Sequence, residues 1–247
     1  MLYTIGYSCV SHIGMIRKMN QDNFICNGVY MNVDGNGPKF PLSGEVSVKP
    51  FALFGVFDGM GGEECGEIAS YIAARESARL AAGKDPVIAL DDFCIHANAS
   101  ICEYASNNGV SSMGTTAAML MFGKKKITLC NIGDSKIYRF ANNEIEQISK
   151  DHVAISAYGT KAPLLQNLGI PEEEMRIEPY YAQGAYVEGD RYLICSDGLT
   201  DMVNVETIRD MLADKSIENA VNRLLNTALE NGGRDNTTII LLEVRRA

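Results

Sequence analysis

The sequence predicts an α+β fold in which antiparallel strands and helices occupy separate stretches of the chain. The clearest strand region runs from Ser111 to Ile148, where short apolar segments joined by tight turns are typical of an antiparallel meander. Segments with helical spacing of apolar residues lie before this region and again near the carboxyl end. At 247 residues, the chain can form one large domain, and we expect a single domain over residues 1–247.

Four longer helices are predicted, and most have a start or stop signal. Asp85 is a favourable N-cap because its carboxylate can accept backbone N–H groups, and Pro86 suits the first helical position. At the amino end, Leu2 to Val10 alternates loosely and is expected to form an edge strand. The predicted helices cover residues 63–82 and 85–108 and begin near Asn204 and after Ser216.

Composition and charge argue against a nucleic-acid-binding protein and for a cytoplasmic one. The chain is 46% hydrophobic and 21% charged with a net charge of −9, whereas nucleic-acid binders normally carry a basic face. Its seven scattered cysteines include no Cys-x-x-Cys pair and predict reduced thiols. No signal peptide is evident, and no stretch approaches the roughly 18 apolar residues of a membrane span. We therefore expect a cytoplasmic protein with no membrane span.

Four aspartates stand at the ends of predicted strands. Asp58 follows the apolar run 51–57, and Asp197 follows a second run of this kind. Asp22 and Asp235 instead directly precede strands. Because the end of one antiparallel strand lies beside the start of its neighbour, we expect the four carboxylates to meet on one rim of the sheets. A single Asp-Gly pair is only a turn signal, so this prediction depends on all four residues.

Four carboxylates on one rim predict a centre for divalent cations. Neighbouring like charges raise one another's pKa, and cations relieve this repulsion. His12 and His96 have no companion His, Cys or acid at metal-ligand spacing, so the oxygen-rich set favours Mg²⁺ or Mn²⁺ over Zn²⁺. Two such ions about 3.5–4 Å apart can activate a bridging water and hold a phosphoryl group for in-line attack.

Short motifs follow one another in order along nearly the whole chain. They are R-x-x-x-x-D (Arg17, Asp22), FDGMGG, GTT, GDS, DH, LLQNLG, SDGL and RDNTT. This set resembles the metal-dependent PPM, or type 2C, Ser/Thr protein phosphatases, and most closely their compact bacterial branch. The resemblance implies a four-layer αββα sandwich of two antiparallel sheets flanked by helices. It also implies hydrolysis of phosphoserine and phosphothreonine by attack of a metal-bound hydroxide.

The resemblance implies a role for each acid in a centre holding two Mn²⁺ or Mg²⁺ ions. Asp58 would bridge the two metals, with the backbone carbonyl of Gly59 as a further ligand. Asp197 and Asp235 would hold one metal, and Asp22 would support the site through water. A third, weaker metal position corresponds to Asp134.

Arg17 would grip the substrate phosphate, since a guanidinium is permanently charged and matches phosphate oxygens two at a time. Residues 150–176 correspond to a flap beside the site and are expected to contain one short helix. The implied partners are phosphorylated Ser/Thr proteins, substrates of a cognate Ser/Thr kinase, and we expect a monomer.

Three positions depart from the family pattern. Gln21 stands where Glu is common, and Lys136 stands where Arg is frequent. Met60 replaces the His that many eukaryotic members use as a proposed general acid. The proton for the leaving group must then come from water or another group.

Rival phosphatase chemistries lack their motifs in this chain. No cysteine is followed six positions later by Arg, and neither Asp-x-Asp nor Gly-Lys-Ser/Thr occurs. Two alternatives stay open. One is a non-catalytic PPM-fold signalling module that binds a partner kinase or phosphoprotein. The other is a two-metal nuclease, which the acidic net charge disfavours.

Overall fold

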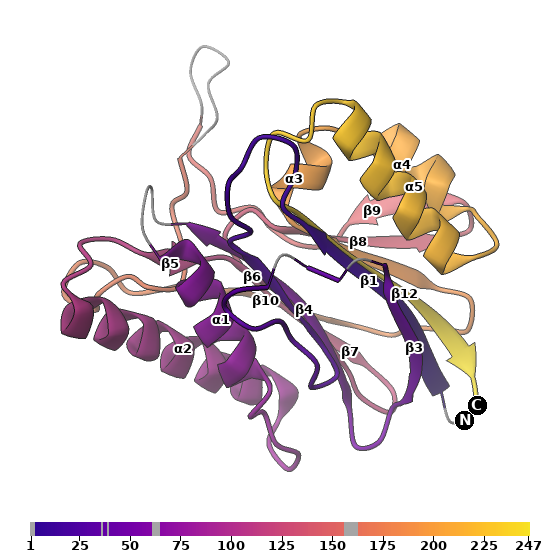
Figure 1. The fold of residues 1–247 in the computed structure, drawn as a ribbon. Helices are drawn as coiled ribbons and strands as arrows, with labels where there is room; N and C mark the ends of the chain where they lie inside the picture. The colour runs from indigo at the N-terminus through magenta and orange to yellow at the C-terminus, as the bar shows by residue number, and fades with distance from the viewer. Residues whose placement is uncertain (1–2, 36, 39, 61–64, 156–162) are drawn as a thin grey trace.

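Two antiparallel β-sheets lie face to face, and helices cover both outer faces (Figure 1). The structure is a computed structural model that describes residues 3–35, 37–38, 40–60, 65–155 and 163–247. The two chain ends lie side by side, because Tyr3 of the first strand pairs with Arg246 of the last. The predicted four-layer αββα sandwich is confirmed.

Each sheet is antiparallel throughout. The first sheet has the strand order β3-β1-β12-β11-β8-β9, and the second has the order β10-β7-β6-β4-β2 with β5 paired to β4. The strands of the first sheet are β1 (Tyr3–His12), β3 (Leu42–Ser47), β8 (Lys136–Ala141), β9 (Glu144–Gln147), β11 (Arg191–Cys195) and β12 (Thr237–Arg246). Those of the second are β2 (Asp22–Cys26), β4 (Ala52–Met60), β5 (Gly114–Thr115), β6 (Ala117–Phe122), β7 (Ile127–Ile132) and β10 (Tyr180–Gly184).

The helices divide between the two outer faces. Helices α1 (Gly66–Ser77) and α2 (Pro86–Asn108) cover the second sheet, and α3 (Asp197–Thr200), α4 (Val205–Leu212) and α5 (Ile217–Glu230) cover the first. The Asp85 carboxylate caps α2 by accepting the N–H of Val87 at 2.9 Å, as its sequence position predicts. No helix in the described ranges is both long and apolar enough to cross a bilayer.

Three apolar layers hold the four layers of secondary structure together. The middle layer lies between the sheets and includes Phe54, Phe122 and Tyr192, all with 1% exposure or less. The second sheet packs on α1 and α2 through residues such as Phe57, while the first packs on the carboxyl-terminal helices. Strands buried on both faces explain why β4, β6 and β12 are continuous apolar runs rather than alternating ones.

Two strand predictions were wrong. β1 is an inner strand, because β3 pairs with its outer side; β3 is mostly exposed and polar, so no strand signal stands out in its residues. The region 111–148 is not one meander. The chain leaves the second sheet at Ile132 and enters the first at Lys136, so the Gly133–Ser135 turn crosses between sheets.

The flap region also differs from expectation. The described parts of residues 150–176 contain no helix. One isolated β-bridge, from Leu168 to Thr115, ties them to the body, and another, from Val153 to Leu164, joins two stretches of the flap itself. Residues 156–162 of the flap, Gly61 and Gly62 of the FDGMGG motif, and the start of the predicted helix 63–82 lie outside the described residues.

Candidate metal centre

Neighbouring strands in each sheet bring the acids to one rim. Asp22 is the first residue of β2 and stands directly opposite Asp58 of β4 in the antiparallel register. In the other sheet, Asp197 follows β11 and Asp235 precedes β12, and these two strands are also paired. β4 continues two residues beyond Asp58, so this aspartate lies within a strand rather than in the turn after it.

Asp22 connects the two sheets. Its Oδ2 accepts hydrogen bonds from Ser196 Oγ at 2.8 Å and from Thr238 Oγ1 at 2.7 Å. Thr238 belongs to β12 of the opposite sheet, and Ser196 directly follows β11 of that sheet. Its Oδ1 is buried and has no hydrogen-bond partner among the described residues. Burial is the main cause that raises the pKa of Asp22 to about 7, assisted by the charges of Asp197 and Asp235 and opposed by the two hydroxyls.

Asp58 lies at the electrostatic centre of the cluster. Burial raises its pKa well above the usual value, and the negative charges of four other aspartates raise it further. In decreasing order these are Asp22, Asp197, Asp134 and Asp235. The predicted convergence of these side chains is therefore present in the folded chain, and Asp134 takes part in it from the turn that crosses between the sheets.

The GTT motif fixes the backbone of Asp58. Its N–H donates to Thr116 Oγ1 at 3.0 Å, and its carbonyl accepts from the Thr116 N–H at 2.9 Å and from Thr115 Oγ1 at 3.0 Å. Thr116 Oγ1 also lies 2.7 Å from Ser135 Oγ, next to Asp134. The sequence contained these threonines as a motif but did not indicate this positioning role.

Gly59 fits a space that no side chain can enter. A Cβ atom there would lie 2.1 Å from the carbonyl oxygen of Gly66 and 2.4 Å from that of Gln21. The Gly59 N–H donates to the Gln21 carbonyl at 3.1 Å. The end of β4 is therefore held against the start of β2 and the first turn of α1.

Arg17 reaches the acidic rim from the loop between β1 and β2. Its Nη2 donates to Asp235 Oδ2 at 2.7 Å, while the Arg17 side chain remains 50% exposed. The bond to Asp235 is the main cause that raises the pKa of Arg17, and the charges of Asp58 and Asp197 contribute. Arg17 thus neutralises part of the acidic cluster and still faces solvent.

Asn236 holds the loop that carries Arg17, a role that sequence reasoning missed. Its Nδ2 donates to the carbonyls of Ile13 and Met19, each at 2.9 Å, and its Oδ1 accepts the Gln21 N–H at 2.8 Å. Asn236 follows Asp235 directly. The dipeptide Asp235-Asn236 therefore supplies both the acid that bonds Arg17 and the side chain that anchors the Arg17 loop. Its place in the RDNTT motif was the only sequence signal.

The DH motif attaches the flap to the turn that carries Asp134. Gly133 and His152 exchange two bonds: the His152 N–H donates to the Gly133 carbonyl at 3.0 Å, and the Gly133 N–H donates to His152 Nδ1 at 3.2 Å. Burial lowers the pKa of His152. Asp151 forms an ion pair with Lys136. Lys136, which stands where Arg is frequent in the family, therefore has a structural partner in this chain.

The donor set fits hard divalent cations, although no three His, Cys, Asp or Glu side chains in the described ranges form a ready-made cage. Asp235 is engaged with Arg17, and one oxygen of Asp22 is engaged with two hydroxyls. The second Asp22 oxygen is buried without a hydrogen bond, a condition that a metal or its water ligand would relieve. Clustered carboxylates with raised pKa values are those that a cation stabilises in their charged form.

Comparison with known proteins identifies the family. Residues 46–233 match the sequence profile described as Protein phosphatase 2C. The chain belongs to this family. The resemblance drawn from the ordered motifs is confirmed, because the profile match covers most of the chain.

Bacterial serine/threonine phosphatases are among the relatives of this protein phosphatase 2C chain. It is 32% identical over 211 residues to serine/threonine protein phosphatase PstP of Mycobacterium tuberculosis, an alignment covering 78% of this chain and 40% of that protein. It is 29% identical over 253 residues to the serine/threonine phosphatase stp of Listeria welshimeri, covering 93% and 92%. The match thus spans less than half the length of the mycobacterial relative.

Solved structures share the fold. The catalytic domain of PstP in complex with two manganese ions superposes with a TM-score of 0.81 at 28% identity, covering 99% of this chain and 100% of that one. PppA of Pseudomonas aeruginosa, described as a key regulatory component of a type VI secretion system, gives 0.78 at 26% identity, with 97% of each chain covered.

Proposed function

We propose that this chain is a Mn²⁺- or Mg²⁺-dependent protein serine/threonine phosphatase that hydrolyses phosphoserine and phosphothreonine. The observation that carries the proposal is the convergence of five aspartates, from both sheets, with one exposed arginine on their rim. Relatives that span nearly the whole chain are named serine/threonine phosphatases, and one solved relative contains two manganese ions. Bound divalent cations would activate water and polarise the phosphoryl oxygens.

The proposed ligands follow from position and charge. The two ions would share Asp58 as a ligand, because the charges of all four other aspartates in the cluster raise the pKa of Asp58. The Gly59 carbonyl would be a further ligand. Asp197 and Asp235 would hold one ion from the first sheet. Asp22 supports the centre through its free oxygen.

Asp134 would bind a third divalent cation more weakly than the other two, consistent with its placement on a separate turn. Its charge acts on Asp58 from that turn, after those of Asp22 and Asp197 and ahead of that of Asp235. A cation there would lie beside the flap, because the adjacent Gly133 is bonded to His152.

Arg17 would bind the substrate phosphate. Its guanidinium already bonds a carboxylate oxygen and is half exposed, so an incoming phosphate dianion can take the place of Asp235. The exchange would release Asp235 for metal binding. Substrate binding and completion of the metal centre would then support each other.

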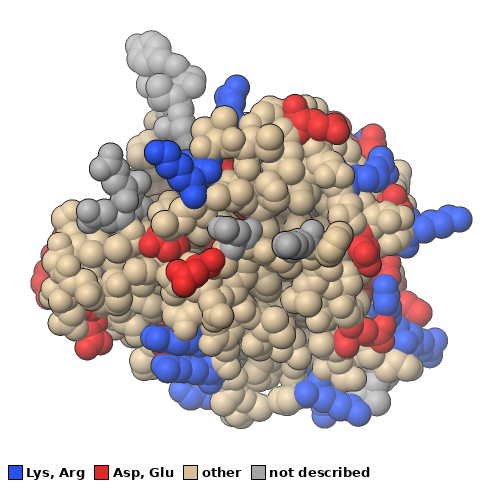
Figure 2. Space-filling model, in the orientation of Figure 1, with Lys and Arg blue, Asp and Glu red and all other residues tan. Residues whose placement is uncertain are grey.

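The remaining proposals concern the setting of the enzyme. We expect a monomeric cytoplasmic protein with one domain over residues 1–247, acting on phosphoproteins made by a cognate kinase. On the face shown in Figure 2, described basic and acidic side chains are interspersed without a continuous basic patch, which agrees with a partner other than nucleic acid. The non-catalytic alternative is disfavoured because the acids and Arg17 are all present.

The decisive experiment is metal-dependent turnover. Hydrolysis of p-nitrophenyl phosphate and of a phosphothreonine peptide should require Mn²⁺ or Mg²⁺, disappear in EDTA and disappear in Asp197→Asn. Asp210→Asn, an exposed acid on α4, is the matched control and should retain full activity. Activity that survives both EDTA and Asp197→Asn would overturn the proposal.

A further inference from the structure

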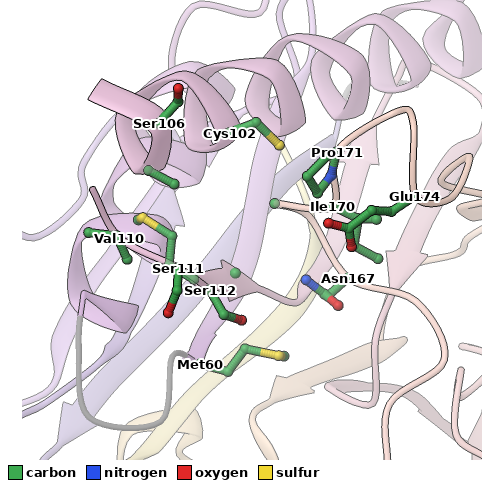
Figure 3. A pocket seen from close by; sticks show the side chains of 14 residues that line it. Met60, Cys102, Ser106, Val110, Ser111, Ser112, Asn167, Ile170, Pro171 and Glu174 are labelled. Carbon is green, nitrogen blue, oxygen red and sulfur yellow. The ribbon is translucent and has the colours of Figure 1, made fainter. Parts of the chain in front are cut away.

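A cavity of about 480 Å³ lies between the carboxyl end of α2, the segment before β5 and the described part of the flap (Figure 3). Met60, the last residue of β4, lines the cavity beside Asn167 of the flap, and Glu174 of the flap lies across it from Val110 and Ser111. Its volume falls within the roughly 300–1,000 Å³ of small-ligand sites. The metal centre described above does not use it.

The flap wall of this cavity is fixed to the body of the protein. The Asn98 side chain of α2 accepts the N–H groups of Gly169 at 2.7 Å and Ile170 at 3.0 Å, and donates to the Ile170 carbonyl at 2.9 Å. Leu168 exchanges two backbone hydrogen bonds of 2.9 Å with Thr115 of β5. The cavity is therefore preformed rather than created by a ligand.

The described lining residues give the cavity negative charge and no positive charge. Glu174 is the only ionised side chain among its fourteen lining residues, and Figure 3 shows its carboxylate directed toward the interior. Burial raises the pKa of the Cys102 thiol in the wall, and the charges of Glu173 and Glu174 raise it further. The carboxyl end of the 23-residue helix α2 adds the negative pole of its dipole, with no basic residue in its last turn.

The remaining wall suits an aliphatic stem. Met60, Val110, Met113, Ile170 and Pro171 provide apolar surface around the single carboxylate. Lysine and arginine side chains match such a wall, because each has an apolar hydrocarbon stem and a positively charged head at its end.

The cavity lies close to Asp58, so one peptide substrate could reach both the acidic rim and the cavity. Met60 lines it and lies two residues after Asp58 in β4, a separation of about 7 Å at strand geometry. Gly59 and Met60 pair with Thr115 and Gly114 of β5, and Gly114 lines the cavity as well. A peptide bound at the rim would reach it within about two to four residues.

We propose that this cavity is a specificity pocket for a lysine or arginine side chain close to the phosphorylated residue of the substrate, with Glu174 as its counter-ion. The inference rests on the proposed phosphatase activity and adds a sequence preference to it. Glu174 acts by binding substrate and takes no part in the chemistry at the metal centre.

The test uses phosphothreonine peptides in which a single arginine is moved through the four positions on either side of the phosphothreonine in an alanine background. We expect at least one position to raise kcat/KM about fivefold or more over the all-alanine peptide. Glu174→Gln should abolish this gain, and Glu174→Lys should favour a glutamate at the same position. Added salt should also reduce the gain, because the pair is partly exposed.

Two controls separate the pocket from the active site. Glu188→Gln alters an exposed glutamate in the turn between β10 and β11 and should leave the arginine preference unchanged. Hydrolysis of p-nitrophenyl phosphate should be equal in wild type, Glu174→Gln and Glu188→Gln, because this substrate has no side chain to place in the cavity. Ser112→Trp, a change in the exposed wall, should also remove the preference by filling the space.

The outcomes are distinguishable. Absence of metal-dependent turnover on any substrate would overturn the phosphatase proposal itself. Turnover without an arginine preference, or with one that Glu174→Gln and Ser112→Trp leave intact, would overturn the pocket alone. A wild-type preference for glutamate would also overturn it.

Discussion

At the residue scale, the site combines acids that repel one another with Arg17, which is hydrogen-bonded to one of them. Asp22 and Asp58 both have raised pKa values because burial and neighbouring carboxylates disfavour their charged forms. Arg17 offsets part of this repulsion through its bond to Asp235. Under the proposed function, the same guanidinium would oppose metal binding at Asp235 and favour phosphate binding.

Replacing Arg17 should separate these two effects. In Arg17→Ala, kcat/KM for a phosphothreonine peptide should fall about 10- to 100-fold, because a hydrogen bond to a charged group contributes about 1.5–3 kcal/mol. Mn²⁺ should bind several-fold more tightly by calorimetry, because the Arg17 guanidinium no longer competes with the metal for Asp235. Arg17→Lys should recover part of the peptide activity. Arg223→Ala, an exposed arginine on α5, is the control, and an unchanged kcat/KM in Arg17→Ala would contradict the assignment.

At the element scale, the end of β4 sets the position of the whole cluster. It is held on one side by the GTT threonines and on the other by the Gln21 carbonyl and α1. The Ser70 hydroxyl of α1 donates to that same Gln21 carbonyl at 2.6 Å. Any atom added to this junction must displace backbone rather than a flexible side chain.

Gly59→Ala should therefore damage both stability and activity. The added methyl group would meet two carbonyl oxygens at 2.1 and 2.4 Å, and overpacking of this kind costs about 1–3 kcal/mol. Urea denaturation measures the loss of stability, and p-nitrophenyl phosphate hydrolysis measures the displacement of Asp58. Gly184→Ala in β10 is the matched control, because no atom lies within 4 Å of the position that its new methyl group would take. Equal behaviour of the two variants would show that the junction tolerates movement.

At the scale of the whole molecule, the acidic rim is also a joint between the two sheets. Asp22 belongs to the second sheet, whereas its partners Ser196 and Thr238 come from the end of β11 and from β12 of the first. The charge state of this one carboxyl thus affects the packing of both halves.

Metal-free protein should become less stable as the pH rises. The folded pKa of Asp22 is raised from 3.8 to about 7, so the native state holds more protons than the unfolded state between these values and stability falls across that window. The raised pKa of Asp58 acts in the same sense. Thermal unfolding in EDTA should show a Tm that declines over this range, and Asp22→Asn should reduce the decline. Mn²⁺ added above pH 7 should raise Tm by binding the native state; a flat Tm in EDTA would contradict the argument.

The fold class and the family could be predicted from local sequence, and so could the convergence of the aspartates, whose roles at the site stay a prediction. Buried strands such as β4 and β12 are continuous apolar runs, and the caps Asp85, Asn204 and Ser216 hold their helices where local chemistry predicts. The four strand-end aspartates were recognisable because antiparallel pairing places strand ends beside strand starts.

The sheet that each strand joins, and the contacts that each acid makes, depend on the packed molecule. β3 carries little apolar signal because it is an exposed edge, and the crossing at Gly133–Ser135 resembles an ordinary hairpin turn because both have the same local residues. The bonds of Asn236 to the Arg17 loop and of Asp22 to Thr238 span more than 200 residues. Such contacts, like the cavity beside Met60, arise from the stacking of layers, which local sequence patterns do not encode.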